Sequence, residues 1–272
     1  MFVRRCIFGA TMKRTTHISS MILLMLGLIT WSCQPAADKS EPDPLSHIQD
    51  AKAARVLSKA MERAGGLDQW QKKRSLQFRK STVLYLENGE VESMADQLHT
   101  YTFADPSVVE IEWMEGPDKM KLTSDYISVS RTRNSQPDSR LDPVSGLNSV
   151  LSSTYVISIP FKLLDPGVEL KYLGLDTLED HSVVHVLQAE HEPSDNPEEY
   201  DTWWHYFDHD TYRQVGYLVR HADHFSLVKN LSFVMVDGFE MVKDRRSYRV
   251  DEHGNIDYLR AVYEYTNYHF TF

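Results

Sequence analysis

The chain has 272 residues, with 39 acidic and 29 basic side chains and a formal net charge of −10. This acidic balance argues against a nucleic-acid-binding protein and against binding to anionic lipid surfaces, because both need clustered positive charge. The length fits a single sizeable domain.

Residues 1–32 are typical of a secretory signal peptide. They contain four basic residues and no acidic one, and an apolar run of nine residues follows at 21–29. A transmembrane helix needs about 20 apolar residues, so a basic segment with a short apolar run predicts a signal peptide instead. Met12, followed by Lys13 and Arg14, is an alternative start of the same signal.

The signal ends in Thr30-Trp31-Ser32-Cys33, which resembles a bacterial lipobox. Ser32 fits the small residue before the cysteine, whereas Thr30 and Trp31 depart from the usual pattern. We expect Cys33 to carry acyl chains such as palmitate and to become the mature N-terminus. An ordinary signal peptide and an uncleaved anchor are the alternatives.

Removal of residues 1–32 leaves 240 residues with a net charge of −14 and one cysteine. No thiol then remains for catalysis, metal binding or an intrachain disulfide. No dense acidic run follows Cys33, which favours an outer-membrane lipoprotein that faces the periplasm. Residues 33–45 contain three prolines without an apolar period, so we expect a flexible tether there and one domain over 46–272.

The first predicted element of the domain is a helix over 46–64. Its apolar residues recur at spacings of three and four, from Ile48 to Met61. Ser46 is the expected N-cap, and Gly65-Gly66 can end the helix. Residues 67–72 are expected to add one further helical turn.

From residue 74 the apolar period changes to two, which predicts strands rich in Tyr, Phe, Trp, Val and Ile. The candidate strands are 74–86, 90–104, 107–115, 118–123, 126–132, 168–174, 182–191, 202–208, 212–221, 225–236, 239–250 and 256–270. Their short connections contain turn dipeptides such as Asn88-Gly89 and Asp237-Gly238, so neighbouring strands should be antiparallel. Residues 138–166 break the alternation. They predict short helical pieces and turns that lie across a sheet.

Several strands are apolar on both faces. In 202–207, Trp203 and Phe207 point one way, and Trp204 and Tyr206 point the other. Since a solvated antiparallel sheet has one polar face, both faces are covered or one faces an apolar cavity. A packed barrel or helix-covered sheet is one interpretation, and a lipid-binding cavity beneath the 138–166 insert is the other. The candidate cavity residues are Ile111, Trp113, Leu122, Phe161, Leu164, Trp204, Tyr206, Tyr217 and Phe233.

This arrangement resembles the bacterial lipoprotein-sorting proteins of the LolA/LolB-like group, and within it an uncharacterised family of bacterial lipoproteins. The resemblance covers most of residues 46–270. It is carried by the N-terminal helix with the stretch 64–70 after it, by the paired strands 204–208 and 211–217, and by the late Asp237-Gly238 hairpin with its strand 245–250.

The resemblance implies an α+β, mainly β fold. The expected architecture is a strongly curved antiparallel half-barrel of about 11 strands, with an N-terminal helix and a short helical insert over the concave face. It also implies that acyl chains bind between sheet and helices. The chain's own anchor makes it more like the membrane-anchored acceptor of that group than the free carrier. No residue matches a known lipoprotein-contact residue.

Catalytic motifs are weakly represented. There is no G-x-S-x-G elbow and no glycine-rich phosphate loop, and Ser145-Gly146 is the nearest fragment. We therefore expect no catalytic residue and no cofactor.

A group of His and Asp residues within 205–224 offers zinc-type ligands, and Asp208 with Asp210 could serve acid/base chemistry. Asp208-His209-Asp210 reads more simply as a turn, and His221 and His224 are expected far from it.

Three functions remain open at this point. The first is a membrane-anchored, non-enzymatic envelope lipoprotein that binds a hydrophobic ligand, either an acyl chain or the lipid moiety of a lipoprotein. The second is an envelope interaction or sensing module without a lipid ligand. The third is a metal-dependent hydrolase built on the His/Asp group. The sequence does not identify a protein partner.

Overall fold

The computed structural model describes residues 43–191 and 201–272. The predicted signal peptide, Cys33 and most of the tether lie outside the described residues. In the part of the chain that is described, no helix is long and apolar enough to cross a membrane.

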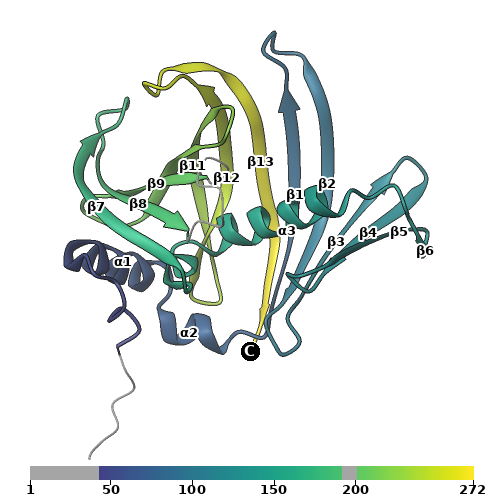
Figure 1. Cartoon of the computed structure of the whole chain (residues 1–272), viewed down its shortest axis with the longest axis horizontal. Coiled ribbons are helices and arrows are strands. Elements are labelled where there is room, and N and C mark those ends of the chain that lie inside the picture. The colour runs from purple at the N-terminus through teal and green to yellow at the C-terminus, as the bar shows by residue number, and fades with distance from the viewer. Residues whose placement is uncertain (1–42, 192–200) are drawn as a thin grey trace, which may run out of the picture. The chain divides into compact units, whose positions relative to one another are not determined.

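One antiparallel sheet of 13 strands dominates the described residues (Figure 1). Its strands are β1 (Ser75–Tyr85), β2 (Val91–Thr102), β3 (Val108–Glu115), β4 (Asp118–Ser124), β5 (Val129–Arg133), β6 (Gln136–Pro137), β7 (Val168–Thr177), β8 (Val183–His191), β9 (Thr202–Asp208), β10 (Gln214–Arg220), β11 (Phe225–Val236), β12 (Phe239–Val250) and β13 (Ile256–Thr271). All twelve expected strands are confirmed, with bounds within three residues. The two-residue β6 was not predicted, so the sheet has 13 strands where the alternation gives twelve and the resemblance implies about 11.

The strand order explains the place of the helical insert. The order is β6-β5-β4-β3-β2-β1-β13-β12-β11-β10-β9-β8-β7, so β1 pairs with β13 in the middle and β6 and β7 are the two edges. The sheet is therefore open. Between β6 and β7 the chain returns through α3 (Pro143–Ser158) and the 3-10 turn η1 (Phe161–Leu164), and α3 lies across the sheet (Figure 1).

The insert forms one long helix rather than the short pieces expected. Asp142 caps it by accepting a hydrogen bond from the Ser145 backbone N–H at 3.1 Å, and Pro143 occupies the first turn, where no backbone N–H is needed. Gly146 lets the helix pack closely, because an added Cβ would lie 2.9 Å from Leu141 and 3.3 Å from Val129 on β5.

The N-terminal helix α1 (Ala51–Ala64) begins later than predicted. Asp50, not Ser46, is its N-cap, because the Asp50 carboxylate accepts hydrogen bonds from two backbone N–H groups of the first turn. Gly65 ends the helix at a φ of 125°, and a Cβ there would meet the backbone oxygen of Gly238 at 2.8 Å. The buried face of α1 packs against β7 and β12.

Aromatic rings pack one end of the core. Trp70, on α2 (Leu67–Lys72), stacks on Phe161 of η1 with centroids 4.4 Å apart, and its edge contacts Phe239 and Phe270. Such ring pairs stabilise the folded state by more than the burial of their apolar surface alone. The short helix and the 3-10 turn are thereby fixed to the last two long strands.

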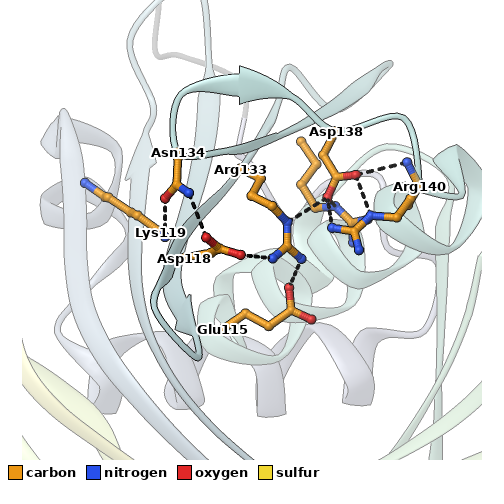
Figure 2. Close-up of polar contacts among 8 residues, drawn as sticks. Glu115, Asp118, Lys119, Arg133, Asn134, Asp138 and Arg140 are labelled. Atoms are coloured by element: carbon orange, nitrogen blue, oxygen red, sulfur yellow. Dashed lines mark hydrogen bonds and ion pairs between the residues drawn. The ribbon is translucent and has the colours of Figure 1, made fainter.

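The β3–β5 edge carries a network of ion pairs (Figure 2). Arg133 on β5 pairs with both Asp118 and Glu115, and Asp138 pairs with Arg140 at 3.0 Å. Hydrogen bonds from Arg140 hold the pKa of Asp138 well below its usual range. Charged side chains of this kind protect the edge of a sheet from pairing with another chain.

Candidate functional site

A cavity of about 660 Å³ lies between α3 and the sheet. This volume is within the range of small-molecule sites, which is roughly 300–1,000 Å³. One face of α3 forms its roof, because the lining residues recur at helical spacing; they are Ser145, Gly146, Ser149, Ser152, Ser153 and Val156. A serine-rich roof is polar enough to tolerate water and small enough to leave space beneath it.

Apolar and aromatic side chains from distant strands form much of the floor. Ile111 on β3 and Leu122 on β4 are register partners at one end. At the other end Trp203 on β9 packs on Tyr217 of β10, with centroids 5.1 Å apart. The other apolar and tyrosine side chains of the lining are Leu84, Trp113, Leu141, Val219, Val228, Tyr263 and Tyr265.

Polar groups interrupt this floor. The buried Arg245 on β12 donates hydrogen bonds to Asn230 Oδ1 at 2.8 Å, Tyr265 Oη at 3.4 Å and the backbone oxygen of Val156 at 3.3 Å. The last contact joins the sheet to the C-terminal end of the roof helix. Arg245 thus holds the roof in position and lines the cavity as well.

His99 on β2 is a neutral member of the lining. It stacks on Phe78 with centroids 4.9 Å apart, and its Nδ1 lies 3.2 Å from the Tyr101 hydroxyl. Burial, with a smaller contribution from the charge of Lys80, lowers the pKa of His99 to about 3. At neutral pH this ring contributes hydrogen-bonding atoms and no charge.

The structure brings only some of the predicted cavity residues together. Ile111, Trp113, Leu122 and Tyr217 line the cavity. The other five lie outside its lining; they are Phe161, Leu164, Trp204, Tyr206 and Phe233.

The reasons for this placement differ. Phe161 is a core residue stacked on Trp70, and Leu164 packs against the same core. On β9 the buried face is that of Trp203 and Phe207, so Trp204 lies on the opposite face. Alternation identified the two faces of this strand correctly, but a sequence gives no rule for which face meets the cavity.

The His/Asp group is divided between separate places. Asp208 accepts hydrogen bonds from the N–H and hydroxyl of Thr211, as its role in a turn requires, while His209 bonds to Asp210 at 2.9 Å. His205 is buried, with its Nε2 2.9 Å from the Tyr155 hydroxyl. Within residues 43–191 and 201–272, no three His, Cys, Asp or Glu side chains are grouped so that they could hold a metal ion.

His221 and His224 lie instead at the cavity, with centroids 4.5 Å apart. His221 Nδ1 bonds to Asp201 at 2.7 Å, and burial lowers the pKa of His224. Alternation alone does not place this pair at the cavity, because both residues lie in the turn between β10 and β11 and only the folded sheet brings that turn to the lining.

No protein-family model matches the chain, and no curated protein sequence matches it significantly. Among solved structures, a DUF1329 family protein from Desulfovibrio piger matches with a TM-score of 0.51 at 11% identity, over 80% of this chain and 92% of that one. A LolA superfamily protein from Nitrosomonas europaea matches with a TM-score of 0.49 at 11% identity, over 79% and 92% of the two chains. The chain is thus structurally similar to the DUF1329 family protein, and at 11% identity this likeness concerns the fold alone.

Proposed function

We propose that this chain is a membrane-anchored envelope lipoprotein that binds a hydrophobic ligand, an acyl chain or the lipid moiety of another lipoprotein, in the cavity beneath α3. It acts without catalysis. The observation that carries the proposal is a ligand-sized cavity whose floor is rich in apolar and aromatic side chains. Acylated Cys33, in the outer membrane and facing the periplasm, provides the anchor.

We infer that the sheet bends into a half-barrel around the proposed site. Leu122 on β4 and Trp203 on β9 line the same cavity, although these strands are eight positions apart in the sheet. Eight spacings amount to about 38 Å along a flat sheet. This supports a sheet that bends around its ligand, with α3 as the cover.

Lipid extraction and binding measurements test the proposal. The mature chain without Cys33, residues 34–272, is a suitable protein because the described helices and strands all lie in one compact unit. We expect native mass spectrometry to detect bound lipid, and the delipidated protein to bind a fluorescent fatty acid. A chain that carries no lipid and binds no fatty acid contradicts the proposal.

A matched pair of variants locates the ligand. Ser149 faces the cavity from α3, while its exposed neighbour Asn148 is not part of the lining. Ser149→Phe should fill the space and weaken fatty-acid binding at least tenfold, while Asn148→Phe should leave it unchanged. Equal effects of the two substitutions would place the ligand elsewhere.

The second candidate function is an envelope interaction module. A surface hollow over β2 and β3 exposes Met94 and Met114 beside Trp113, with 74% and 61% of the two methionines accessible. Flexible methionine side chains on a surface suit protein contacts. Site-specific photo-crosslinking from position 96 in the envelope should then capture one defined partner, and Met94→Lys with Met114→Lys should abolish that crosslink.

A further inference from the structure

The cavity carries a charge opposite to that of the chain. The protein is acidic, with a net charge of −10, yet among the residues that the structure describes five cationic side chains and two carboxylates line the cavity. The cations are Lys80, Arg131, Arg245, Arg249 and Arg260, and the carboxylates are those of Asp142 and Asp201. Asp142 caps α3 and Asp201 bonds to His221, so both carboxylates are already engaged.

Two of the five cations have a carboxylate of their own. Arg131 pairs with Asp138 at 3.2 Å, and Arg260 pairs with Glu92. Within the described part of the chain, no carboxylate forms an ion pair with Lys80, Arg245 or Arg249. Lys80 lies over the Tyr263 ring, 5.0 Å from its centroid, and Arg249 donates to the Ser226 hydroxyl at 2.7 Å.

Arg245 is the most deeply buried of these cations, with 2% of its surface accessible. Its three acceptors are neutral and engage three of the five guanidinium N–H groups. A buried charge without a counter-charge destabilises the folded state, and an anionic ligand would relieve that cost. The C-terminal dipole of α3, reached through the Val156 carbonyl, offers only about half a negative charge.

The unpaired arginines lie together on one strand face. Arg245, Ser247 and Arg249 alternate along β12 and all face the cavity. Ser247 is small, and its strand neighbours are Ala261 and Val228, so space remains between the two longer side chains. On β1, Lys80 is the register partner of Tyr265, whose hydroxyl contacts Arg245.

Building on the proposed function, we infer that the ligand is an anionic amphiphile whose carboxylate or phosphate oxygens lie over Ser247, between Arg245 and Arg249 and beside Lys80. Its apolar chain extends beneath α3 toward Ile111 and Leu122. Five inter-strand spacings, about 24 Å, separate β12 from β4. An acyl chain spans about 15 Å, half of the hydrocarbon core of a bilayer, so it fits within this distance and reaches from the arginines toward Leu122.

Ligands that share a dodecyl chain and differ in the headgroup test the inference on the mature chain. Dodecanoate, dodecyl phosphate and dodecanol compete with a fluorescent fatty acid near neutral pH, and inorganic phosphate is a fourth competitor. We expect the two anionic amphiphiles to bind at least tenfold more tightly than dodecanol. Arg249→Met and Lys80→Met should each lower the affinity for dodecanoate and dodecyl phosphate about tenfold. The affinity for dodecanol, which has no charged headgroup, should not fall.

Matched controls separate charge from folding. Arg246→Met removes an exposed arginine from the opposite face of β12. It should change neither the affinity for the anionic amphiphiles nor the affinity for dodecanol. Arg245→Met also removes the contact with α3, so Arg249 and Lys80 carry the test if that variant does not fold. Thermal unfolding of each variant checks its fold.

The outcomes are distinct. Equal affinity for dodecanoate, dodecyl phosphate and dodecanol overturns the anionic site while the hydrophobic cavity stands. Failure of every amphiphile overturns the proposed function as well. If inorganic phosphate displaces the fluorescent fatty acid at the same concentration as dodecyl phosphate, the site binds a free oxyanion. That result overturns the inference that the ligand is an amphiphile. Loss of anion preference in Arg249→Met, but not in Arg246→Met, confirms the assignment.

Discussion

The carboxylate of Asp50 joins the first turn of α1 to the backbone of Tyr172 on β7. Its Oδ1 accepts from the N–H groups of Lys52 and Ala53 at 2.9 and 3.1 Å, and its Oδ2 accepts from the Tyr172 N–H at 2.8 Å. β7 is an edge strand, and its register with β8 shifts between Tyr172 and Gly174. The hydrogen bond from Tyr172 is the largest contribution to the lowered pKa of Asp50.

Substitution of Asp50 should therefore separate two effects. We expect Asp50→Ala to lower the free energy of unfolding by about 1–3 kcal/mol, because it removes both the helix cap and the link to the edge strand. Asp50→Asn keeps one carbonyl oxygen for the cap and should cost less. Urea unfolding measures both values, and an Asp50→Asn variant as stable as the wild type would contradict a separate role for the Tyr172 bond.

Glu240 on β12 bridges two arginines and should be costly to neutralise. Its Oε1 accepts from Arg63 on α1 at 2.6 Å and from Arg213 at 2.7 Å, while only 7% of its side chain is accessible. Glu240→Gln should lower the free energy of unfolding by about 1–3 kcal/mol. This loss is smaller than for a fully buried ion pair, because both arginines are about one-third exposed and water screens their charge. The exposed Glu264 provides a control, since Glu264→Gln should change stability by less than about 0.5 kcal/mol.

His99 should make stability depend on pH. Its pKa is lowered from 6.5 to about 3 in the folded state, so the unfolded chain binds a proton at a pH where the folded chain does not. The stability is present above pH 6.5 and is lost as the pH falls toward 3. Between about pH 7.5 and about pH 5, the wild type should lose about 2 kcal/mol relative to His99→Gln. Parallel unfolding curves of the two proteins at both pH values check this, and a constant difference would show that His99 protonates in the folded state.

Gly216 on β10 should not tolerate a side chain. A Cβ at this position would lie 2.3 Å from the backbone oxygen of Val228 on the paired strand. Gly216→Ala should cost about 1–3 kcal/mol through forced strand displacement, and should weaken ligand binding because Val228 lines the cavity. Gly89→Ala is the control: no atom lies within 4 Å of its Cβ, so only its φ of +83° is strained and binding should not change.

Much of the sheet could be predicted because its signals are local. Period-two alternation and turn dipeptides such as Asn88-Gly89 placed every long strand within three residues. The start of α1 was missed because Ser46 and Asp50 are both good caps, and the choice depends on the contact with Tyr172, 122 residues away. The continuous α3 was missed because serines interrupt its apolar pattern, and these serines face the cavity.

The cationic character of the cavity could not be predicted. Arg245 and Arg246 are adjacent, and only the strand register decides which of them faces inward. The pairing of β11 with β12 shifts register near Asn230 and Ser232, and that of β12 with β13 shifts near Ser247. Each shift changes the face of the later residues on the strand that carries the extra residue, and alternation alone gives no warning of it.

The pairing of β1 with β13 has a consequence for how the chain reaches its folded state. Ser75 and Thr271 are register partners, so within residues 43–191 and 201–272 the two halves of the sheet join through its first and last strands. Until β13 arrives, β1 presents an unpaired strand edge, which is the kind of surface that associates with other chains. Pairing across such a sequence distance is slow, and the seam should be the last part of the sheet to form. Truncation before β13 should therefore leave two unjoined meanders that are prone to aggregate, even though most of the sheet's sequence is present.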